Sequence, residues 1–172
     1  MLDSRRLLNF GGFAACAAML LYALFLQKFM HLEPCPLCMF QRAGIVLLGA
    51  VFLLAALFSP RGASGARIWG VLIALVALVP IAVAGRHIWV QSQPEGTVPS
   101  CGATLDYMLQ VFPVLDVIRQ VLRGGGECAK IDWRFLGLTM PMWVVISCLA
   151  LAVFALWVNG RRVSRESVRI SA

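Results

Sequence analysis

Four of the six cysteines in this 172-residue chain stand in polar segments, in an arrangement that can exchange electrons. Cys35 and Cys38 form a C-x-x-C pair, whereas Cys101 and Cys128 are 27 residues apart. A thiolate attacks a disulfide through a mixed-disulfide intermediate, so two neighbouring dithiols can pass a disulfide from one to the other. Redox chemistry is therefore the first function that the sequence suggests.

The C-x-x-C pair precedes a long apolar run, and its surroundings favour a reactive thiolate. Pro36 suits the first position of a helix because it lacks an amide hydrogen that would be unpaired there. Cys38 would then lie in the first turn, where the helix dipole favours negative charge. Arg42 follows Cys38 by four residues and should share its helix face. We expect Arg42 to stabilise the thiolate and an electron acceptor bound at the membrane boundary, although an arginine that only reaches towards lipid headgroups is the plainer alternative.

The second pair has two interpretations that the residues alone leave open. Cys101 and Cys128 most simply form a disulfide, which for an isolated pair would be a staple that closes a loop and contributes about 3 kcal/mol or slightly more. A C-x-x-C predicted on the same side of the membrane favours a relay between two dithiols instead. The catalytic residues predicted from the sequence are therefore Cys35, Cys38, Cys101 and Cys128.

Zinc bound by these four cysteines is a competing interpretation. Structural zinc usually takes two closely spaced pairs, and here one pair is widely split, so we expect no metal. His31 and His87 border the same polar segments and could be ligands or proton carriers. Packing at the membrane interface is the commoner role for such histidines, and we assign them no function.

The segments between these residues are too apolar for a soluble domain. Hydrophobic residues make up 60% of the chain and charged residues 13%, with a mean hydropathy of +0.84. Apolar runs of about 18 to 21 residues are long enough to cross the hydrocarbon core. We predict an all-α membrane protein, a four-helix bundle with spans at residues 10–30, 39–58, 68–85 and 141–158. Cys16 and Cys148 lie inside spans and should pack there as small apolar residues.

The distribution of charge predicts which side each polar segment faces. Residues 1–9, 59–67 and 159–172 hold eight arginines against Asp3 and Glu166, whereas residues 31–38 and 86–140, counted with the neighbouring Lys28 and Arg42, hold seven cations against six carboxylates. Positive charge is retained on the cytoplasmic side, so both termini should be cytoplasmic and both cysteine pairs should face the oxidising side. The net charge of +7 thus reflects topology. No basic stripe interleaved with aromatic residues suggests nucleic-acid binding.

The long loop, residues 86–140, should contain one short amphipathic helix on the membrane surface. Leu115, Ile118, Val121 and Leu122 recur at helical spacing, with charged residues on the other face. Pro113 should mark its start and the Gly124-Gly125-Gly126 run its end.

These features together resemble a known family, the disulfide bond formation protein B (DsbB) family of bacterial inner membranes. The similarity covers nearly the whole chain: four spans, the C-x-x-C followed by Gln41-Arg42, two cysteines in the long loop, and the stretch from Trp133 to Trp143. The resemblance implies a thiol:quinone oxidoreductase that sustains disulfide formation in the periplasm. The reaction with DsbA and quinone is a known property of the family.

The resemblance also implies an order of events. A reduced periplasmic thioredoxin-fold oxidase of the DsbA type would attack Cys101 and release Cys128, which would then attack Cys35. Cys38 would be freed to form a charge-transfer contact with ubiquinone, or menaquinone under anaerobic conditions, while Arg42 polarises the ring. Arg42 and Cys38 are therefore the predicted quinone-binding residues, and the membrane quinone pool and DsbA are the predicted partners.

Two other protein classes share part of this pattern. Enzymes similar to vitamin K epoxide reductase have a four-helix core, a C-x-x-C and loop cysteines, but their C-x-x-C belongs to the last span and here it opens the second. A non-catalytic membrane protein with four spans could hold the same cysteines only as staples. Consumption of quinone by membranes supplied with reduced DsbA distinguishes an enzyme from such a staple protein.

Overall fold

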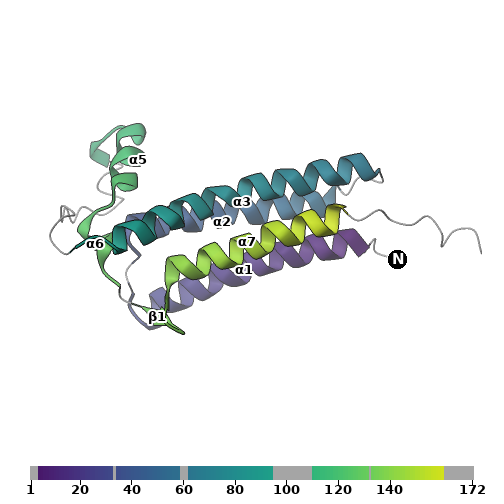
Figure 1. The fold of residues 1–172 in the computed structure, drawn as a ribbon. Helices are drawn as coiled ribbons and strands as arrows, with labels where there is room; N and C mark the ends of the chain where they lie inside the picture. The colour runs from purple at the N-terminus through teal and green to yellow at the C-terminus, as the bar shows by residue number, and fades with distance from the viewer. Residues whose placement is uncertain (1–3, 33, 59–61, 95–109, 132, 161–172) are drawn as a thin grey trace, which may run out of the picture.

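Four long helices form an elongated bundle in the computed structural model of the chain (Figure 1), which describes residues 4–32, 34–58, 62–94, 110–131 and 133–160. The helices are α1 (Ser4–Phe29), α2 (Pro36–Leu57), α3 (Ala63–Gln91) and α7 (Met140–Gly160). All four are long and apolar enough to cross a membrane. The predicted fold class, a helical membrane protein with four spans, is confirmed.

Each helix of the bundle packs against two neighbours, but one of the four contacts is much smaller than the others. α3 lies against α7 and α2, and α2 lies against α1, whereas α1 and α7 touch each other much less. Phe52 of α2 is fully buried, and a Cβ at Gly12 of α1 would collide with its ring, so a glycine is needed for α1 to approach this closely. Where α1 begins and α7 ends, Asn9 and Asn159 exchange side-chain hydrogen bonds of 3.2 and 3.1 Å.

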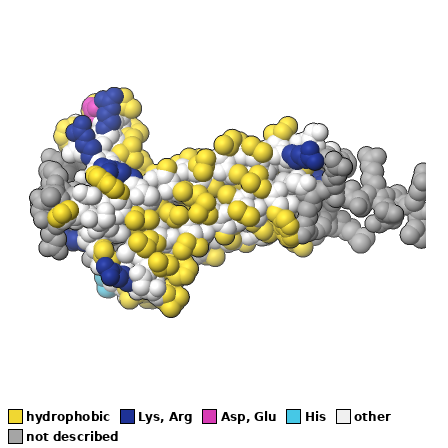
Figure 2. Space-filling model, in the orientation of Figure 1, with side chains coloured by type: hydrophobic (Ala, Val, Ile, Leu, Met, Phe, Trp, Pro, Cys, Tyr) yellow, Lys and Arg dark blue, Asp and Glu magenta, His cyan; other side chains and the backbone are white. Residues whose placement is uncertain are grey.

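The outer surface of the bundle is what a lipid environment requires. Figure 2 shows hydrophobic side chains along the length of the bundle, with Lys and Arg gathered towards its two ends. Leu21 and Val153, both near the middle of their helices, are each 66% exposed, which would be costly in water over so large an area. The chain is a multi-pass membrane protein.

Three small elements cover the end of the bundle where α2 begins. They are the helix α5 (Val114–Arg123), the one-turn helix α6 (Gly126–Ala129) and a hairpin of β1 (Arg134–Phe135) and β2 (Leu138–Thr139). In the antiparallel hairpin Arg134 pairs with Thr139 and Phe135 with Leu138. Leu136 and Gly137 both have positive φ, at 51° and 79°, as two-residue hairpin turns require.

The helices differ from the predicted spans mainly at their ends. α1 begins at Ser4 within the predicted terminal segment, and α3 continues to Gln91, so the first residues of the segment predicted as the long loop are helical. Hydrophobicity marks the membrane-spanning part of a helix, whereas helical backbone continues beyond it until something stops it. α5 does begin after Pro113 and end before Gly124, as predicted.

The apolar side chains of α5 have two kinds of surroundings. Val117 and Val121 are buried, whereas Leu115 and Leu122, part of the face predicted to lie on the membrane surface, are 60% and 40% exposed. Val117 and Val121 pack with Val90 of α3, which the sequence had placed in a loop. The extension of α3 therefore decides which side of α5 faces the protein.

Candidate redox site

The C-x-x-C pair lies where the sequence predicted, at the first turn of α2. Cys35 is the N-cap, its sulfur accepts a hydrogen bond from the Cys38 amide at 3.4 Å, and Pro36 takes the first helical position. The two sulfurs are 3.2 Å apart, with the Cys35 thiol donating to Cys38. The extended backbone at Cys35 (φ −66°, ψ 162°) directs its side chain back over the helix end, which brings the sulfurs together.

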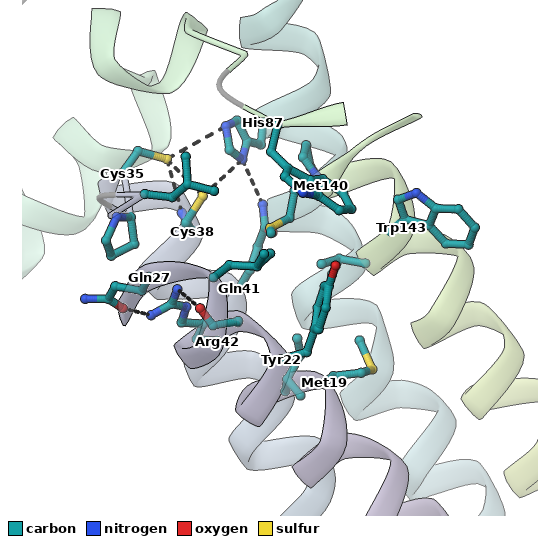
Figure 3. Close-up of a pocket in the computed structure, with 18 of the residues that line it drawn as sticks. Met19, Tyr22, Gln27, Cys35, Cys38, Gln41, Arg42, His87, Met140 and Trp143 are labelled. Carbon is teal, nitrogen blue, oxygen red and sulfur yellow. Dashed lines mark hydrogen bonds between the residues drawn. The ribbon is translucent and has the colours of Figure 1, made fainter. Parts of the chain in front are cut away.

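His87 lies directly against both sulfurs (Figure 3). Its Nε2 is 3.8 Å from the Cys35 sulfur and its Nδ1 is 4.0 Å from the Cys38 sulfur. The ring is only 2% exposed. It reaches this position because α3 continues as a helix past Gly85, which carries residue 87 alongside the start of α2.

The hydrogen bonds of His87 define its tautomer. Nε2 lies 3.1 Å from the backbone carbonyl of Cys128, which can only accept, so Nε2 carries the proton. Nδ1 is then free to accept from the Gln41 side-chain amide at 3.0 Å. Gln41 is itself 3% exposed, so a buried amide holds the imidazole in one orientation between the C-x-x-C pair and α6.

Cys128 is brought to the same place from the opposite side. It is 1% exposed and packs with Leu37, Val117 and Cys35 in one buried cluster. Its thiol is hydrogen-bonded to Cys35, and this bond, together with burial and the negative charge that Cys35 can carry, raises the pKa of Cys128 far above its usual value. In the described part of the chain, three sulfurs thus form one continuous group: Cys128, Cys35 and Cys38.

The segment that carries Cys128 is attached to α3 by specific contacts. Arg86 donates to the last carbonyls of α5, with Nε to Leu122 at 2.7 Å and Nη2 to Arg123 at 3.0 Å, and its guanidinium lies 3.9 Å above the Trp89 ring. A cation at this helix end also complements the dipole. Gly124 then turns the chain with φ +83°, packed so closely that a Cβ would lie 2.6 Å from Val90.

A cavity of about 370 Å³ opens beside Cys38. Its walls come mainly from α1, α2, the hairpin region and α7, and Cys35, Cys38, Arg42 and His87 all line it. Most of the remaining lining is apolar or aromatic, including Tyr22, Trp133 and Trp143. Trp133 stacks on Phe135 with ring centroids 5.9 Å apart, and the Trp143 indole donates to the Phe135 carbonyl at 3.2 Å. The size and lining are those of a small-molecule site.

Arg42 lines the cavity but is also bonded to α1. Nη1 donates to the Gln27 side chain at 2.6 Å and Nη2 to the Ala23 carbonyl at 3.2 Å. These bonds fix the guanidinium at the cavity wall, and neither acceptor is an anion that would offset its charge. Both roles considered for Arg42, stabilising an electron acceptor and reaching towards lipid headgroups, stay predictions.

The predicted site residues are thus brought together as far as the structure describes them. Cys35, Cys38, Arg42 and Cys128 gather at one end of the bundle, while Cys101 and its predicted pairing with Cys128 lie outside the described residues. Sequence reasoning missed His87 and Gln41. The spacing of Gln41 three residues after Cys38 was a usable signal, because that spacing shares a helix face. No comparable signal marked His87.

Comparison with known proteins gives concordant results. The family described as disulfide bond formation protein DsbB matches residues 5–158 of the chain. Three relatives with the name disulfide bond formation protein B are similar over most of their length. The protein of Xanthomonas axonopodis pv. citri is 46% identical over 91% of each chain. That of Chromobacterium violaceum is 48% identical over 87% of this chain and 89% of its own, and that of Nitrosococcus oceani is 44% identical over 92% and 93%.

Proposed function

The chain belongs to the DsbB family and is a disulfide oxidoreductase of the membrane, and from this premise we propose that it reoxidises a DsbA-type periplasmic dithiol oxidase and passes the electrons to ubiquinone. The observation that carries the proposal is the row of sulfurs from Cys128 through Cys35 to Cys38, which ends at a cavity lined by Arg42. We further propose that this end of the bundle faces the periplasm of the bacterial inner membrane.

The proposed relay begins with two disulfide exchanges. A thiolate of the reduced partner attacks Cys101 of a Cys101–Cys128 disulfide, and Cys128 leaves as a thiolate. Cys128 then attacks Cys35 of the Cys35–Cys38 disulfide, and Cys38 leaves. The partner's second thiol displaces Cys101 and completes the partner's disulfide; Cys101 then attacks Cys128 and releases Cys35, and oxidation of the Cys35–Cys38 dithiol by the quinone restores the second disulfide. The contact between Cys128 and Cys35 supports the second exchange, since attack requires the two sulfurs to meet.

The electrostatics of Cys128 are consistent with this direction. Two causes of its raised pKa are the hydrogen bond that the Cys128 thiol donates to Cys35 and the negative charge that Cys35 can carry. Both weaken when Cys35 is in a disulfide with Cys38, because a disulfide sulfur carries no charge and accepts hydrogen bonds poorly. Cys128 is therefore better able to exist as a nucleophilic thiolate when its target is oxidised.

The cavity fits a quinone in chemistry and in place. Its aromatic and apolar walls suit a lipid-soluble ring, and Arg42 supplies a fixed cation for a ring oxygen. A bound quinone would accept two electrons and two protons, which balances the conversion of two thiols into one disulfide. Cys38 lines this cavity together with Cys35, and His87, with Nδ1 4.0 Å from the Cys38 sulfur, can take up its proton. Ubiquinone is proposed, with menaquinone as the anaerobic alternative.

The direct test measures quinone consumption. Purified protein in lipid nanodiscs, given reduced DsbA and ubiquinone, should convert one quinone for each DsbA disulfide formed. A variant with Cys35→Ala and Cys38→Ala should consume none. If the wild-type protein reduced no quinone under these conditions, its cysteines would be staples and the proposal would fail.

A trapping experiment tests the order of the relay. In a Cys128→Ser variant, Cys101 is a free thiol that can attack the disulfide of oxidised DsbA, and its own pair has no second thiol to resolve the product, so a mixed disulfide with DsbA should accumulate. Peptide mapping should locate that bond at Cys101. The matched variant Cys38→Ser keeps the Cys101–Cys128 disulfide but lacks the Cys35–Cys38 disulfide that Cys128 attacks, so it should oxidise one equivalent of reduced DsbA and reduce no quinone. A DsbA adduct at Cys35 would reverse the proposed order.

A further inference from the structure

We infer that Cys35, Cys38 and His87 in the reduced chain form a binding site for one thiophilic divalent cation, represented by Zn²⁺, and that occupancy of this site stops electron transfer. Their donor atoms all lie within 4.8 Å of one another. This site is distinct from the four-cysteine zinc site considered from the sequence, because its third ligand is a histidine of α3. It is an inhibitory site, and no resident metal is required for the proposed reaction.

The distances among the donors approach those of a tetrahedral zinc site. Zinc bonds to thiolate sulfur at about 2.3 Å and to histidine nitrogen at about 2.0–2.1 Å, which places its ligand atoms roughly 3.5–3.8 Å from one another. The sulfurs of Cys35 and Cys38 are 3.2 Å apart, and the Cys38 sulfur is 4.0 Å from Nδ1 of His87. Small side-chain movements would bring the donor atoms to the distances of a tetrahedral zinc site.

The histidine is already oriented as metal-binding histidines are. Such a ring usually donates its second N–H to a carbonyl or carboxylate, which fixes the tautomer and the direction of the lone pair. Here Nε2 donates to the Cys128 carbonyl at 3.1 Å. Nδ1 therefore offers its lone pair towards Cys38, and the metal would replace only the hydrogen bond from Gln41.

Cys128 is close to this site but is not one of its donors. Its thiol is hydrogen-bonded to Cys35. Its sulfur is nevertheless not one of the donor atoms that lie within 4.8 Å of one another, which belong to Cys35, Cys38 and His87. Three protein ligands leave the fourth position of a tetrahedron for water or a small anion. The cavity beside Cys38 gives access to that position.

Binding depends on the redox state of the pair. Coordination of Zn²⁺ by two thiols releases their protons and transfers no electrons. A Cys35–Cys38 disulfide offers no thiolate, so the cation should bind only to the reduced chain. Once bound, it occupies the electron pairs on both sulfurs that attack or disulfide formation would need.

Binding is measured on the full-length chain without quinone. The protein in nanodiscs is reduced with a phosphine, freed of reductant without oxygen, and titrated with Zn²⁺ against a chromophoric chelator; Co²⁺ is used as a spectroscopic probe. We expect one Zn²⁺ per reduced chain, sulfur-to-cobalt charge-transfer absorption, and loss of both after the dithiol is oxidised. Unchanged binding after oxidation would overturn the inference.

Matched variants identify the ligands. Cys38→Ser and His87→Ala should each weaken Zn²⁺ binding by about a hundredfold or more, since each removes a metal ligand. His31→Ala, which changes an exposed histidine, and Cys128→Ser should bind within about threefold of wild type. Equal loss in His31→Ala, or no loss in His87→Ala, would contradict the site. Because quinone is absent, failure here leaves the proposed electron transfer standing, and failure of quinone reduction leaves this binding measurable.

Discussion

The buried cysteines in the middle of the bundle and the buried cysteine at its end are equally inaccessible but have different neighbours. Cys16 and Cys148 are 1% and 0% exposed in the middle of the bundle, and Cys128 is 1% exposed at its end. The first two pack among aliphatic and aromatic side chains such as Ile45, Leu48 and Phe52. Cys128 also has apolar neighbours, but it contacts Cys35 and presents its carbonyl to His87.

Burial alone therefore does not separate the core cysteines from the one predicted to be catalytic. What differs is the neighbouring groups: the end of the bundle that holds Cys128 also holds a second sulfur, an imidazole and the cavity proposed for an electron acceptor. A buried thiol without these acts as a small apolar residue. The experiments below test that difference, from the largest effect to the smallest.

The largest effect should come from the cysteine nearest the cavity. Cys38→Ser should lower quinone reduction by roughly a thousandfold or more, because a hydroxyl cannot form the disulfide that releases the electrons. Cys148→Ala, a matched change of a cysteine in the bundle core, should leave turnover within about twofold of wild type. Similar losses in both variants would remove the distinction between the two groups. The measurement is ubiquinone reduction with saturating reduced DsbA.

Arg42 should matter less, and mainly for quinone. Arg42→Met removes a charge-assisted hydrogen bond of about 1.5–3 kcal/mol, so the apparent KM for ubiquinone should rise roughly tenfold to a hundredfold with the KM for DsbA unchanged. Gln27→Met is the control, since it breaks the 2.6 Å bond to Arg42 but keeps the cation. If both variants lost the same affinity, Arg42 would act only as a tether between α1 and α2.

The attachment of Cys128 should depend on Gly124. Gly124→Ala puts a Cβ at positive φ, which costs about 1–2 kcal/mol, and brings it into Val90. The segment should detach more often, so Cys128 should react with an alkylating reagent about tenfold faster. Gly137→Ala has the same kind of φ, +79°, with no atom within 4 Å, and should not change Cys128 reactivity. Equal acceleration in both would indicate general destabilisation.

The smallest effect concerns the bundle core itself. Cys16→Ala and Cys148→Ala each delete one buried sulfur, so each should lower the free energy of unfolding by about 1 kcal/mol without altering the redox reaction. Thermal unfolding of the nanodisc-bound protein is the measurement. If the DsbA-dependent rate fell by more than the loss of folded protein explains, the core cysteines would take part in the relay.

Several features followed from local sequence alone. Four apolar runs of membrane-spanning length predict four helices whatever their arrangement, because every backbone group in lipid must be paired. Pro36 between two cysteines predicts the start of α2 and the position of Cys38 in its first turn, and Pro113 and Gly124 predict the ends of α5. Each of these is decided by a few adjacent residues.

Other features had no local signal. The turn at Leu136 and Gly137 lacks the Asn-Gly or Asp-Gly that usually marks a two-residue hairpin, so β1 and β2 were not expected. The burial of Val117 and Val121 against Val90 was not predicted, because the sequence placed Val90 in the long loop. His87 was given no function because a single histidine at the end of an apolar run is usually a packing residue.

The sequence by itself determined the number of spans and the family and singled out the predicted redox residues, because length, hydrophobicity and cysteine spacing are properties of the chain before it folds. The tertiary structure alone decided that Cys128, Cys35, Cys38 and His87 meet. His87 is 49 residues from Cys38 along the chain, and Cys128 is 41 residues beyond His87. Contacts over such separations depend on how far α3 extends and how α5 docks on it, which is set by packing and hydrogen bonding among several elements at once.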